Sequence, residues 1–374
     1  MKKKNTYGRC DSLSRSHRKV FLYAYDRQNL GDDLFIHTIV KRYPHVKFYM
    51  WSDLKNRQIF RCLPNLKILQ KEGRMVRFLK RLRPSLVSRY RNWLENRCQA
   101  VVYIGGSIFM EYDHWAQILT WWEYMAEHRP FYVMGANFGP YHTEDYRKKF
   151  GQIYAKMKDV CFRDRYSYDL FREVAAVRQA PDILFSYPMP QVEVQQKQLF
   201  VSVIDCASRD ESHGLTRYDA SYVENMAQLL NQYRREGYRL VLGSFCTHEG
   251  DERGIQKIVK AMGAEESEDL QVLRYDGTNA EQITEAMAQS SLVIATRFHA
   301  AILAIVAGRP VLPVIYSDKT LHVLEDLGFE GPVIDIRSCE DYTAVGAPEE
   351  ASVDCQTLAR EAQKHFEKLD QVLQ

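Results

Sequence analysis

Short apolar runs rich in Val, Ile, Phe and Tyr alternate with amphipathic or charged stretches along most of the chain, and this rhythm constrains the fold more than any other feature. The runs of the first half include KVFLYAY, VKFYMWS, AVVYIGG and FYVMGAN. The pattern restarts in the second half with LFVSVID, YRLVLGSF, SLVIAT and PVLPVIY. Buried strands separated by helical segments are typical of parallel βαβ units. The sequence therefore predicts an α/β fold.

A stretch rich in Pro and Gln, SYPMPQVEVQQKQ at residues 186–198, interrupts this rhythm and indicates a linker. The chain of 374 residues also exceeds the size of a typical single core. We therefore expect two doubly wound Rossmann-like domains, residues 1–188 and residues 189–374, which face a cleft. Ligands of such sheets bind beyond the carboxyl ends of the strands, so the functional side chains are expected in the loops there.

The charge of the chain is distributed unevenly. Residues 1–100 hold 24 Lys and Arg against 7 Asp and Glu, a net charge of +17, whereas the whole chain carries only +3. This asymmetry suggests that the N-terminal part meets an anion, either a membrane surface, nucleic acid or a phosphorylated substrate. No DNA- or RNA-binding signature accompanies the charge, so we expect no nucleic-acid partner.

The densest basic segment, residues 72–96, predicts an amphipathic helix pair interrupted at Pro84. Cations beside exposed aromatic and aliphatic side chains would suit a peripheral site on an anionic membrane surface. An ordinary surface helix packed on its own domain has the same pattern, and both interpretations stay open.

Cysteine usage and hydropathy indicate the compartment. The eight cysteines form no CxxC pair, which argues against a zinc cage or a disulfide framework and fits a reducing cytoplasm. The apolar run at residues 20–25 is too short for a signal-peptide core, and Arg309 and Pro310 break the run at residues 299–316 short of a membrane span. We expect a cytoplasmic protein, peripheral on the inner face of the membrane if the basic helix pair docks there. No cluster with metal-ligand spacing occurs, so we expect neither a metal nor a cofactor.

Three polar side chains, Arg297, His299 and Lys319, stand in the otherwise apolar segment 295–320. SLVIAT predicts a strand and AAILAIVAG a helix that ends at Gly308, which places Arg297 and His299 at a strand-to-helix turn. Lys319 follows the next strand. A helix N-terminus with added cations favours an anion, and histidine can move a proton near neutral pH. Alternatively, Arg297 pairs with an acid and Lys319 begins a solvated helix.

The segment TRFHAAILAIVAGRPVLPVIYSDK resembles the signature of the polysaccharide pyruvyl transferase family, with Arg-x-His opening a helix, then Gly-x-Pro, a strand, Tyr and Lys. Other landmarks of the family follow in its order: NLGDD (29–33), YIGGSIF, MGANFGP (134–140), FRDRYSYDLF (162–171) and APDILF. Together they cover nearly the whole chain. Two positions depart from the family pattern, because Ile104 replaces the first glycine of the glycine loop and Ile183 stands where proline often follows the aspartate.

The resemblance implies a two-domain architecture like that of GT-B glycosyltransferases, with phosphoenolpyruvate as donor and a hydroxyl pair on a sugar as acceptor. It also implies bacterial envelope or exopolysaccharide assembly, and we expect a lipid-linked oligosaccharide as the acceptor. Forming a pyruvate ketal requires cations for the donor, a group that transfers protons and a pocket that excludes water. Catalytic roles are assigned to His299 and Arg297, and substrate binding to Arg163, Lys319, Gly105, Gly106 and Asn29.

Several of these residues have alternative roles. Arg163 matches the family's Arg-Asp position, but it could instead form an ion pair with Asp164 or Asp182. The glycines at 105 and 106 could simply permit a tight turn. Asp32 is expected to cap a helix, and its alternative role is to orient a sugar hydroxyl. Two other functions also stay open for the whole protein: a GT-B glycosyltransferase that uses a nucleotide sugar, and a non-catalytic scaffold of envelope biosynthesis.

Overall fold

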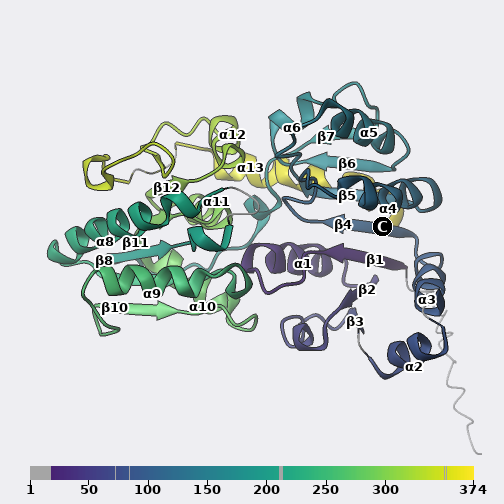
Figure 1. Cartoon of the computed structure of the whole chain (residues 1–374), viewed down its shortest axis with the longest axis horizontal. Coiled ribbons are helices and arrows are strands. Elements are labelled where there is room, and N and C mark those ends of the chain that lie inside the picture. The colour runs from purple at the N-terminus through teal and green to yellow at the C-terminus, as the bar shows by residue number, and fades with distance from the viewer. Residues whose placement is uncertain (1–17, 72, 84, 210–213, 349, 351) are drawn as a thin grey trace, which may run out of the picture.

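The computed structural model describes residues 18–374 apart from residues 72, 84, 210–213, 349 and 351, and it forms two parallel sheets that lie end to end (Figure 1). The first sheet has seven strands in the order β3-β2-β1-β4-β5-β6-β7, and the second has six in the order β10-β9-β8-β11-β12-β13. Both orders place the first strand of the half in the interior of its sheet, which is the doubly wound arrangement. The predicted fold class is confirmed.

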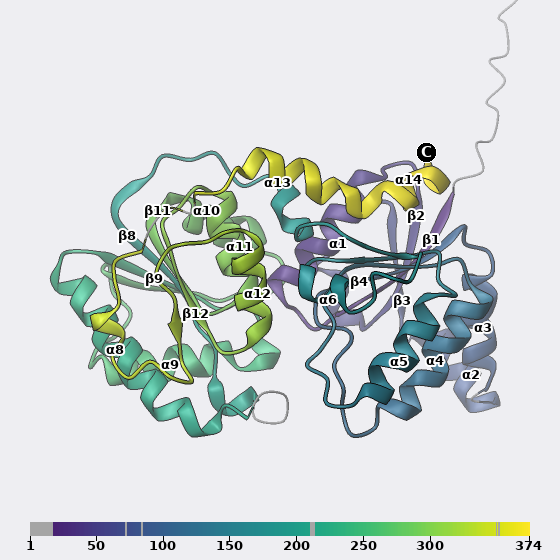
Figure 2. The same ribbon diagram turned by 90° about the horizontal axis from the view of Figure 1, so that it is seen from above.

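The strands of the first sheet are β1 (Lys19–Ala24), β2 (Lys47–Ser52), β3 (Leu66–Gln70), β4 (Ala100–Ile104), β5 (Phe131–Ala136), β6 (Asp159–Phe162) and β7 (Val177–Gln179). The helices of this half are α1 (Leu30–Arg42), α2 (Arg74–Leu82), α3 (Ser85–Glu95), α4 (Trp115–His128), α5 (Glu144–Tyr154) and α6 (Arg165–Asp169), followed by the 3₁₀ helix η2 (Ile183–Ser186). Every residue of β5 is buried, because helices cover both faces of the sheet (Figure 2).

The second sheet consists of β8 (Gln195–Ser202), β9 (Arg239–Gly243), β10 (Leu270–Leu273), β11 (Ser290–Ala295), β12 (Val311–Ile315) and β13 (Ile334–Asp335). Its helices are α8 (Asp219–Arg235), α9 (Asp251–Ala261), α10 (Ala280–Gln289), α11 (Phe298–Val306) and α12 (Asp318–Asp326). As predicted, the alanine-rich helix α11 ends just before Gly308, whose φ of +64° suits the left-handed cap that glycine adopts without strain.

The predicted linker is shorter than residues 186–198, because β8 already begins at Gln195. The first three residues of β8 are exposed and the last five are buried. The strand therefore starts outside the core, where Gln and Lys side chains reach water and carry no apolar signal.

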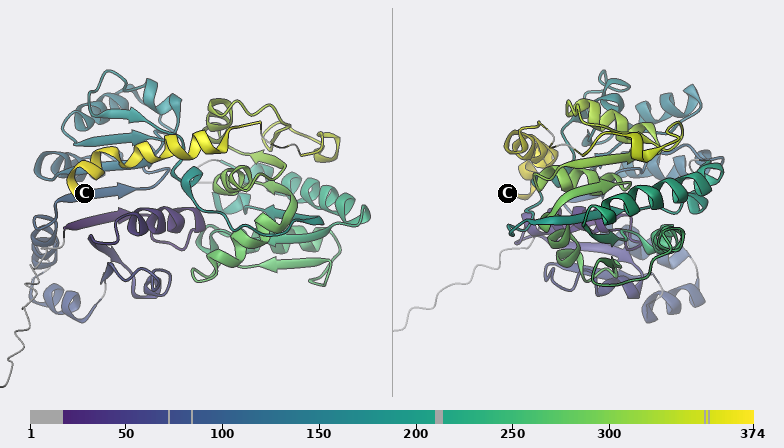
Figure 3. Two further views of the ribbon diagram at one scale, coloured as in Figure 1. Left: turned by 180° about the vertical axis from the view of Figure 1, so that it is seen from behind. Right: turned by 90° about the vertical axis from the view of Figure 1, so that its left-hand side faces the viewer.

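The chain ends in α13 (Cys355–Ala362) and α14 (Glu367–Leu373), which cross back to the first sheet (Figure 3). Arg42 of α1 forms an ion pair with Asp370 at 2.6 Å, and Arg178 at the end of the first sheet donates to the carbonyl oxygen of His365 at 2.8 Å. Phe366 is fully buried. Residues 355–374 thus pack with the first half of the molecule, while the domain boundary at residue 188 stays a prediction.

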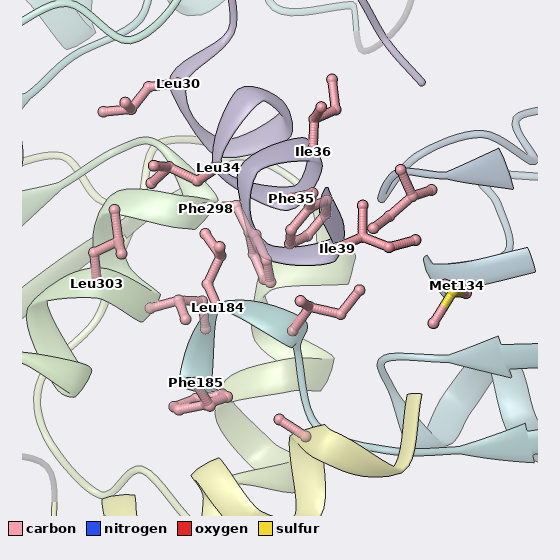
Figure 4. Packing of buried hydrophobic residues seen from close by; sticks show 14 of the residues in the cluster. Leu30, Leu34, Phe35, Ile36, Ile39, Met134, Leu184, Phe185, Phe298 and Leu303 are labelled. Atoms are coloured by element: carbon pink, nitrogen blue, oxygen red, sulfur yellow. The ribbon is translucent and has the colours of Figure 1, made fainter. Parts of the chain in front are cut away.

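One apolar cluster holds the two halves together. It includes Leu34 and Phe35 of α1 together with Phe298 and Leu303 of α11, and Figure 4 shows these side chains converging around Leu184 of η2. All five are buried, with exposed fractions between 0% and 6%. Such a core fixes how the carboxyl ends of the two sheets face each other.

Polar contacts seal the same junction. The backbone N–H of Leu30 donates to the carbonyl oxygen of Phe245 at 2.9 Å, and the Tyr275 hydroxyl donates to Asp33 at 2.7 Å. Both contacts join the start of α1 to loops of the second sheet. The loop that contains the NLGDD segment therefore belongs to the junction as much as to its own domain.

Within the described residues, no helix has the length and apolar character that a membrane span requires. The same part of the chain places no three or more His, Cys, Asp or Glu side chains together as a metal site. Seven cysteines lie in it as free thiols, and Cys10 lies outside it.

Candidate functional site

A cavity of about 410 Å³ lies between the carboxyl ends of the two sheets. Residues of both halves line it, as expected for sheets of this kind. The lining includes Asn29 and Asp32 near the start of α1, Gly106 and Ser107 after β4, Arg163 after β6, Glu249 after β9, Arg297, Phe298 and His299 after β11, and Tyr316 and Lys319 after β12.

Arg163 brings a guanidinium group from the first half to this cavity. It is 3% exposed, donates to Asp182 at 3.0 Å and to Asn137 at 2.8 Å, and lies 4.1 Å above the ring of Phe298. The ion pair with Asp182, one of the two alternatives that the sequence left open, is therefore formed. The same guanidinium still lines the cavity, so pairing and contact with a ligand are compatible for this side chain.

His299 is held by Arg163, whose Nη1 lies 3.3 Å from His299 Nε2. A guanidinium group can only donate, so Nε2 accepts and Nδ1 carries the proton of a neutral ring. Burial and the charges of Arg163 and Lys319 lower the pKa of His299 well below its usual value. At neutral pH this imidazole is therefore uncharged, so it cannot donate a proton as an imidazolium ion.

Gly31 explains how His299 reaches this position. A Cβ atom placed on Gly31 would lie 1.8 Å from His299 Nδ1, so no larger residue fits beside the ring. The imidazole also meets Phe35 edge-on, with ring centroids 5.1 Å apart. The glycine of NLGDD in the first half thus creates the space for the histidine of the second half.

The two glycines after β4 differ in their surroundings. A Cβ atom on Gly106 would lie 2.6 Å from the Arg163 guanidinium, so this glycine lets the arginine approach the cavity floor. Gly105 is absent from the described lining; its backbone N–H donates to the carbonyl oxygen of Met134 at 3.2 Å. Gly105 therefore fits the alternative role of permitting the turn, and its substrate contact stays a prediction.

Arg297 is almost completely buried, at 6% exposure, and carboxylates surround it. Its Nε donates to Asp251 at 2.9 Å, and its two terminal nitrogens bind Asp251 and Glu249. Burial alone would lower the pKa of Arg297, but these two carboxylates outweigh it and raise the pKa well above its usual value. The structure agrees with the alternative in which Arg297 pairs with acids, so its contact with a substrate stays a prediction.

Lys319 is the second residue of α12, yet its side chain points inward. Its Nζ donates to Ser107 of the first half at 3.1 Å, and burial lowers its pKa. Among the described residues, no carboxylate forms an ion pair with it, in contrast to Arg163 and Arg297. A half-buried ammonium group with no carboxylate in direct contact among the described residues favours the binding of an anion.

Asp32 does not cap α1, contrary to the expectation from the sequence. Asn29 is the N-cap, because its side-chain oxygen accepts from the backbone N–H of Gly31 at 3.1 Å. An asparagine three residues earlier satisfies the helix end equally well and frees the Asp32 carboxyl to line the cavity. Burial and the neighbouring charge of Glu249 raise the pKa of Asp32 to about 7.

Sequence reasoning gave no role to several residues of the site. Glu249, with its partner Asp251, lies in the loop after β9, and the rule that loops at carboxyl ends carry function would have found both. Arg209 and Tyr316 also line the cavity and are joined by a hydrogen bond of 3.3 Å. Arg209 gives no local signal, because its place depends on the packing of the segment after β8 against Glu249.

The fold and the cavity define a two-domain α/β protein of the GT-B type with a cationic site between its sheets. Solved structures share this fold at low sequence identity. The UDP-GlcNAc 2-epimerase of Neisseria meningitidis bound to UDP-GlcNAc is 10% identical, with a TM-score of 0.53 over 94% of both chains. Anabaena HepE in complex with UDP and glucose is 10% identical, with a TM-score of 0.50 over 95% of this chain and 96% of that one.

The family is more specific than the fold. The sequence model of the polysaccharide pyruvyl transferase family matches residues 29–318. The chain belongs to this family, as its motifs predicted. The amylovoran biosynthesis protein AmsJ of Erwinia amylovora is 22% identical over 267 residues. That alignment covers 66% of this chain and 63% of AmsJ, so less than two thirds of the relative is matched.

Proposed function

We propose that the protein transfers the pyruvyl group of phosphoenolpyruvate to two hydroxyls of a sugar and forms a pyruvate ketal in the biosynthesis of a bacterial cell-surface polysaccharide. One observation carries the proposal: Lys319, without a carboxylate partner among the described residues, shares a cavity with a carboxyl group that holds a proton near neutral pH and an imidazole that does not. An enol phosphate needs such a set of groups, because it must be bound as an anion and protonated on carbon.

The cationic part of the cavity suits the donor. Of its four basic side chains, Arg209 and Arg297 both pair with Glu249. Arg163, which pairs with Asp182 outside the described lining, and Lys319 stand beside His299. We assign the carboxylate and phosphate of phosphoenolpyruvate to Arg163 and Lys319. In this account Arg297 is a positioning residue, which fixes the turn that presents His299.

The proton chemistry divides between Asp32 and His299. The neutral carboxyl of Asp32 protonates the terminal carbon of the enol phosphate, and a sugar hydroxyl attacks the cationic centre that results. His299 accepts the proton of this hydroxyl at Nε2 once Arg163 turns from the imidazole to the bound donor. The phosphate then leaves as hydrogen phosphate, and the second hydroxyl closes the ring. One proton from Asp32 becomes part of the new methyl group, and one hydroxyl proton leaves on the phosphate. The other hydroxyl proton passes from His299 through solvent back to Asp32, so the atoms balance and both groups regain their starting state.

Aromatic side chains in the cavity lining suit a sugar. Tyr25, Tyr103 and Tyr112 line the cavity, and Tyr112 is 50% exposed. Aromatic faces offer flat apolar surface, and their hydroxyls offer hydrogen bonds to an acceptor. We place the acceptor here, beside Asn29 and Gly106, and propose a lipid-linked oligosaccharide as its form.

The reaction is tested by incubating the protein with phosphoenolpyruvate and a panel of soluble and lipid-linked sugars. We expect phosphate release that depends on one acceptor, together with a product that carries an acid-labile ketal. In heavy water the ketal methyl group should hold one deuterium, because its new proton comes from an exchangeable carboxyl. Consumption of a nucleotide sugar, with phosphoenolpyruvate untouched in every mixture, would contradict the proposal.

A further inference from the structure

Helix α2 exposes most of its apolar face. Met75, Phe78 and Leu82 are 51%, 60% and 60% exposed, and their spacing of three and four residues aligns them in one stripe. Val76 is the buried residue of this helix. The helix therefore packs on its domain with one edge of the apolar face and leaves the rest in water, which marks an interaction surface rather than a core element.

The stripe is surrounded by positive charge. Residues 73–97 contain eight Lys and Arg and a single acid, Glu95. Glu95 is 1% exposed and accepts from Arg129 at 3.3 Å, so it does not reach the outer surface. Arg74, Arg77 and Arg81 are exposed beside the stripe.

Helix α3, which packs against α2, extends the same surface. Its Trp93 is 51% exposed, Tyr90 stacks on it with ring centroids 6.0 Å apart, and the Arg97 guanidinium lies 4.7 Å from the ring centre. Tryptophan beside arginine is typical of the boundary between headgroups and acyl chains. Both helices lie at the end of the first half that is farthest from the second (Figures 1 and 2).

We propose that α2 and α3 dock the protein on an anionic lipid bilayer, with Met75, Phe78, Leu82 and Trp93 in the headgroup region and the arginines at the lipid phosphates. The positive charge of this face favours an anionic membrane over a second copy of the protein. A second copy of the same face would bring Arg74, Arg77 and Arg81 against the same arginines, whereas an anionic bilayer complements them and buries the apolar stripe. Of the two interpretations that the sequence left open, the exposed stripe favours the membrane.

Sedimentation with vesicles tests the proposal without any sugar substrate. We expect the full chain to bind vesicles of equal parts phosphatidylcholine and phosphatidylglycerol and to bind phosphatidylcholine alone far more weakly. Each basic residue at such a surface contributes about fivefold, from about 1 kcal/mol, so Arg77→Gln with Arg81→Gln should weaken binding about 30-fold. Phe78→Ser with Leu82→Ser should weaken it about tenfold or more, because the apolar stripe is lost.

Matched controls lie elsewhere on the surface. Arg235→Gln with Lys260→Gln removes the same charge from exposed positions on α8 and α9, and Ile118→Ser changes an apolar residue that is 47% exposed on α4. Binding of both controls should stay within about twofold of wild type. Wild-type protein that ignores the anionic vesicles, or controls that lose as much as the α2 variants, would overturn the proposal. Light scattering that shows a dimer broken by Phe78→Ser with Leu82→Ser, with vesicle binding unchanged, would assign the face to a second copy instead.

Discussion

Replacing Asp32 by asparagine should lower the rate of pyruvyl transfer by about 10²- to 10⁴-fold, the range for loss of a general acid. The amide has the shape of the carboxyl group but no proton to give to carbon. Binding of phosphoenolpyruvate should persist, since the substitution removes a partly ionised acid from an anion site. Steady-state kinetics with the acceptor found by product screening measures both quantities.

The pH dependence of the rate also tests the role of Asp32. The pKa of Asp32 is raised to about 7, so its proton is present below pH 7 and is lost above it. The wild-type kcat/KM should therefore fall about tenfold per pH unit above pH 7, and this limb should be missing in the residual activity of Asp32→Asn. Asp33→Asn is the control, because Asp33 contacts Tyr275 at the domain junction. Asp32→Asn activity close to wild type, or a wild-type profile flat to pH 9, would remove Asp32 from the mechanism.

Arg297→Met should lower the stability of the protein and Lys319→Met its affinity for the donor, although both substitutions remove a cation from the same cavity. Losing Arg297 leaves the buried carboxylate of Asp251 without its main partner, and the free energy of unfolding should fall by about 3 kcal/mol. Lys319 forms no ion pair with a carboxylate among the described residues, so Lys319→Met should be as stable as wild type. Its affinity for phosphoenolpyruvate should instead fall about 10- to 100-fold, because a charged hydrogen bond to the ligand is lost.

Denaturant unfolding and titration calorimetry separate the two outcomes. Arg297→Lys provides the conservative comparison, since it restores the charge without the two-sided hydrogen bonding of the guanidinium. An Arg297→Met protein as stable as wild type, with donor binding lost, would make Arg297 a direct ligand. A Lys319→Met protein that binds phosphoenolpyruvate normally would place the donor elsewhere.

The sequence predicted the architecture because the information is local. Buried parallel strands are continuous apolar runs, which the sequence shows directly. Because ligands bind at the carboxyl ends of such strands, Arg163, His299 and Lys319 could be predicted to share one site although they are far apart in the chain, and all three line the cavity. The family motifs located the same residues independently. Periodicity did not show the return of α14 to the first sheet, where Arg42 and Asp370, far apart in the chain, form an ion pair.

The roles of individual polar groups were harder to predict. Asp32 and Asn29 are both good helix caps by residue type, and only the fold decides which of them caps α1. Local spacing does not identify the acids that pair with Arg297, because they follow a different strand, some 46 residues earlier in the chain. Burial and distant partners set the pKa of each group, and neither is encoded in local spacing.

The central claim, that this cavity binds phosphoenolpyruvate, is tested most directly by a thermal-shift titration with phosphoenolpyruvate beside UDP, GDP, ATP and inorganic phosphate. No acceptor is required. We expect selective stabilisation by phosphoenolpyruvate, about 2.7 kcal/mol at a hundredfold excess over the dissociation constant, and loss of that response in Lys319→Met. Stabilisation by a nucleotide alone would contradict phosphoenolpyruvate binding and favour glycosyl transfer. No change of melting temperature with any ligand would contradict donor binding to the free protein and favour a non-catalytic scaffold.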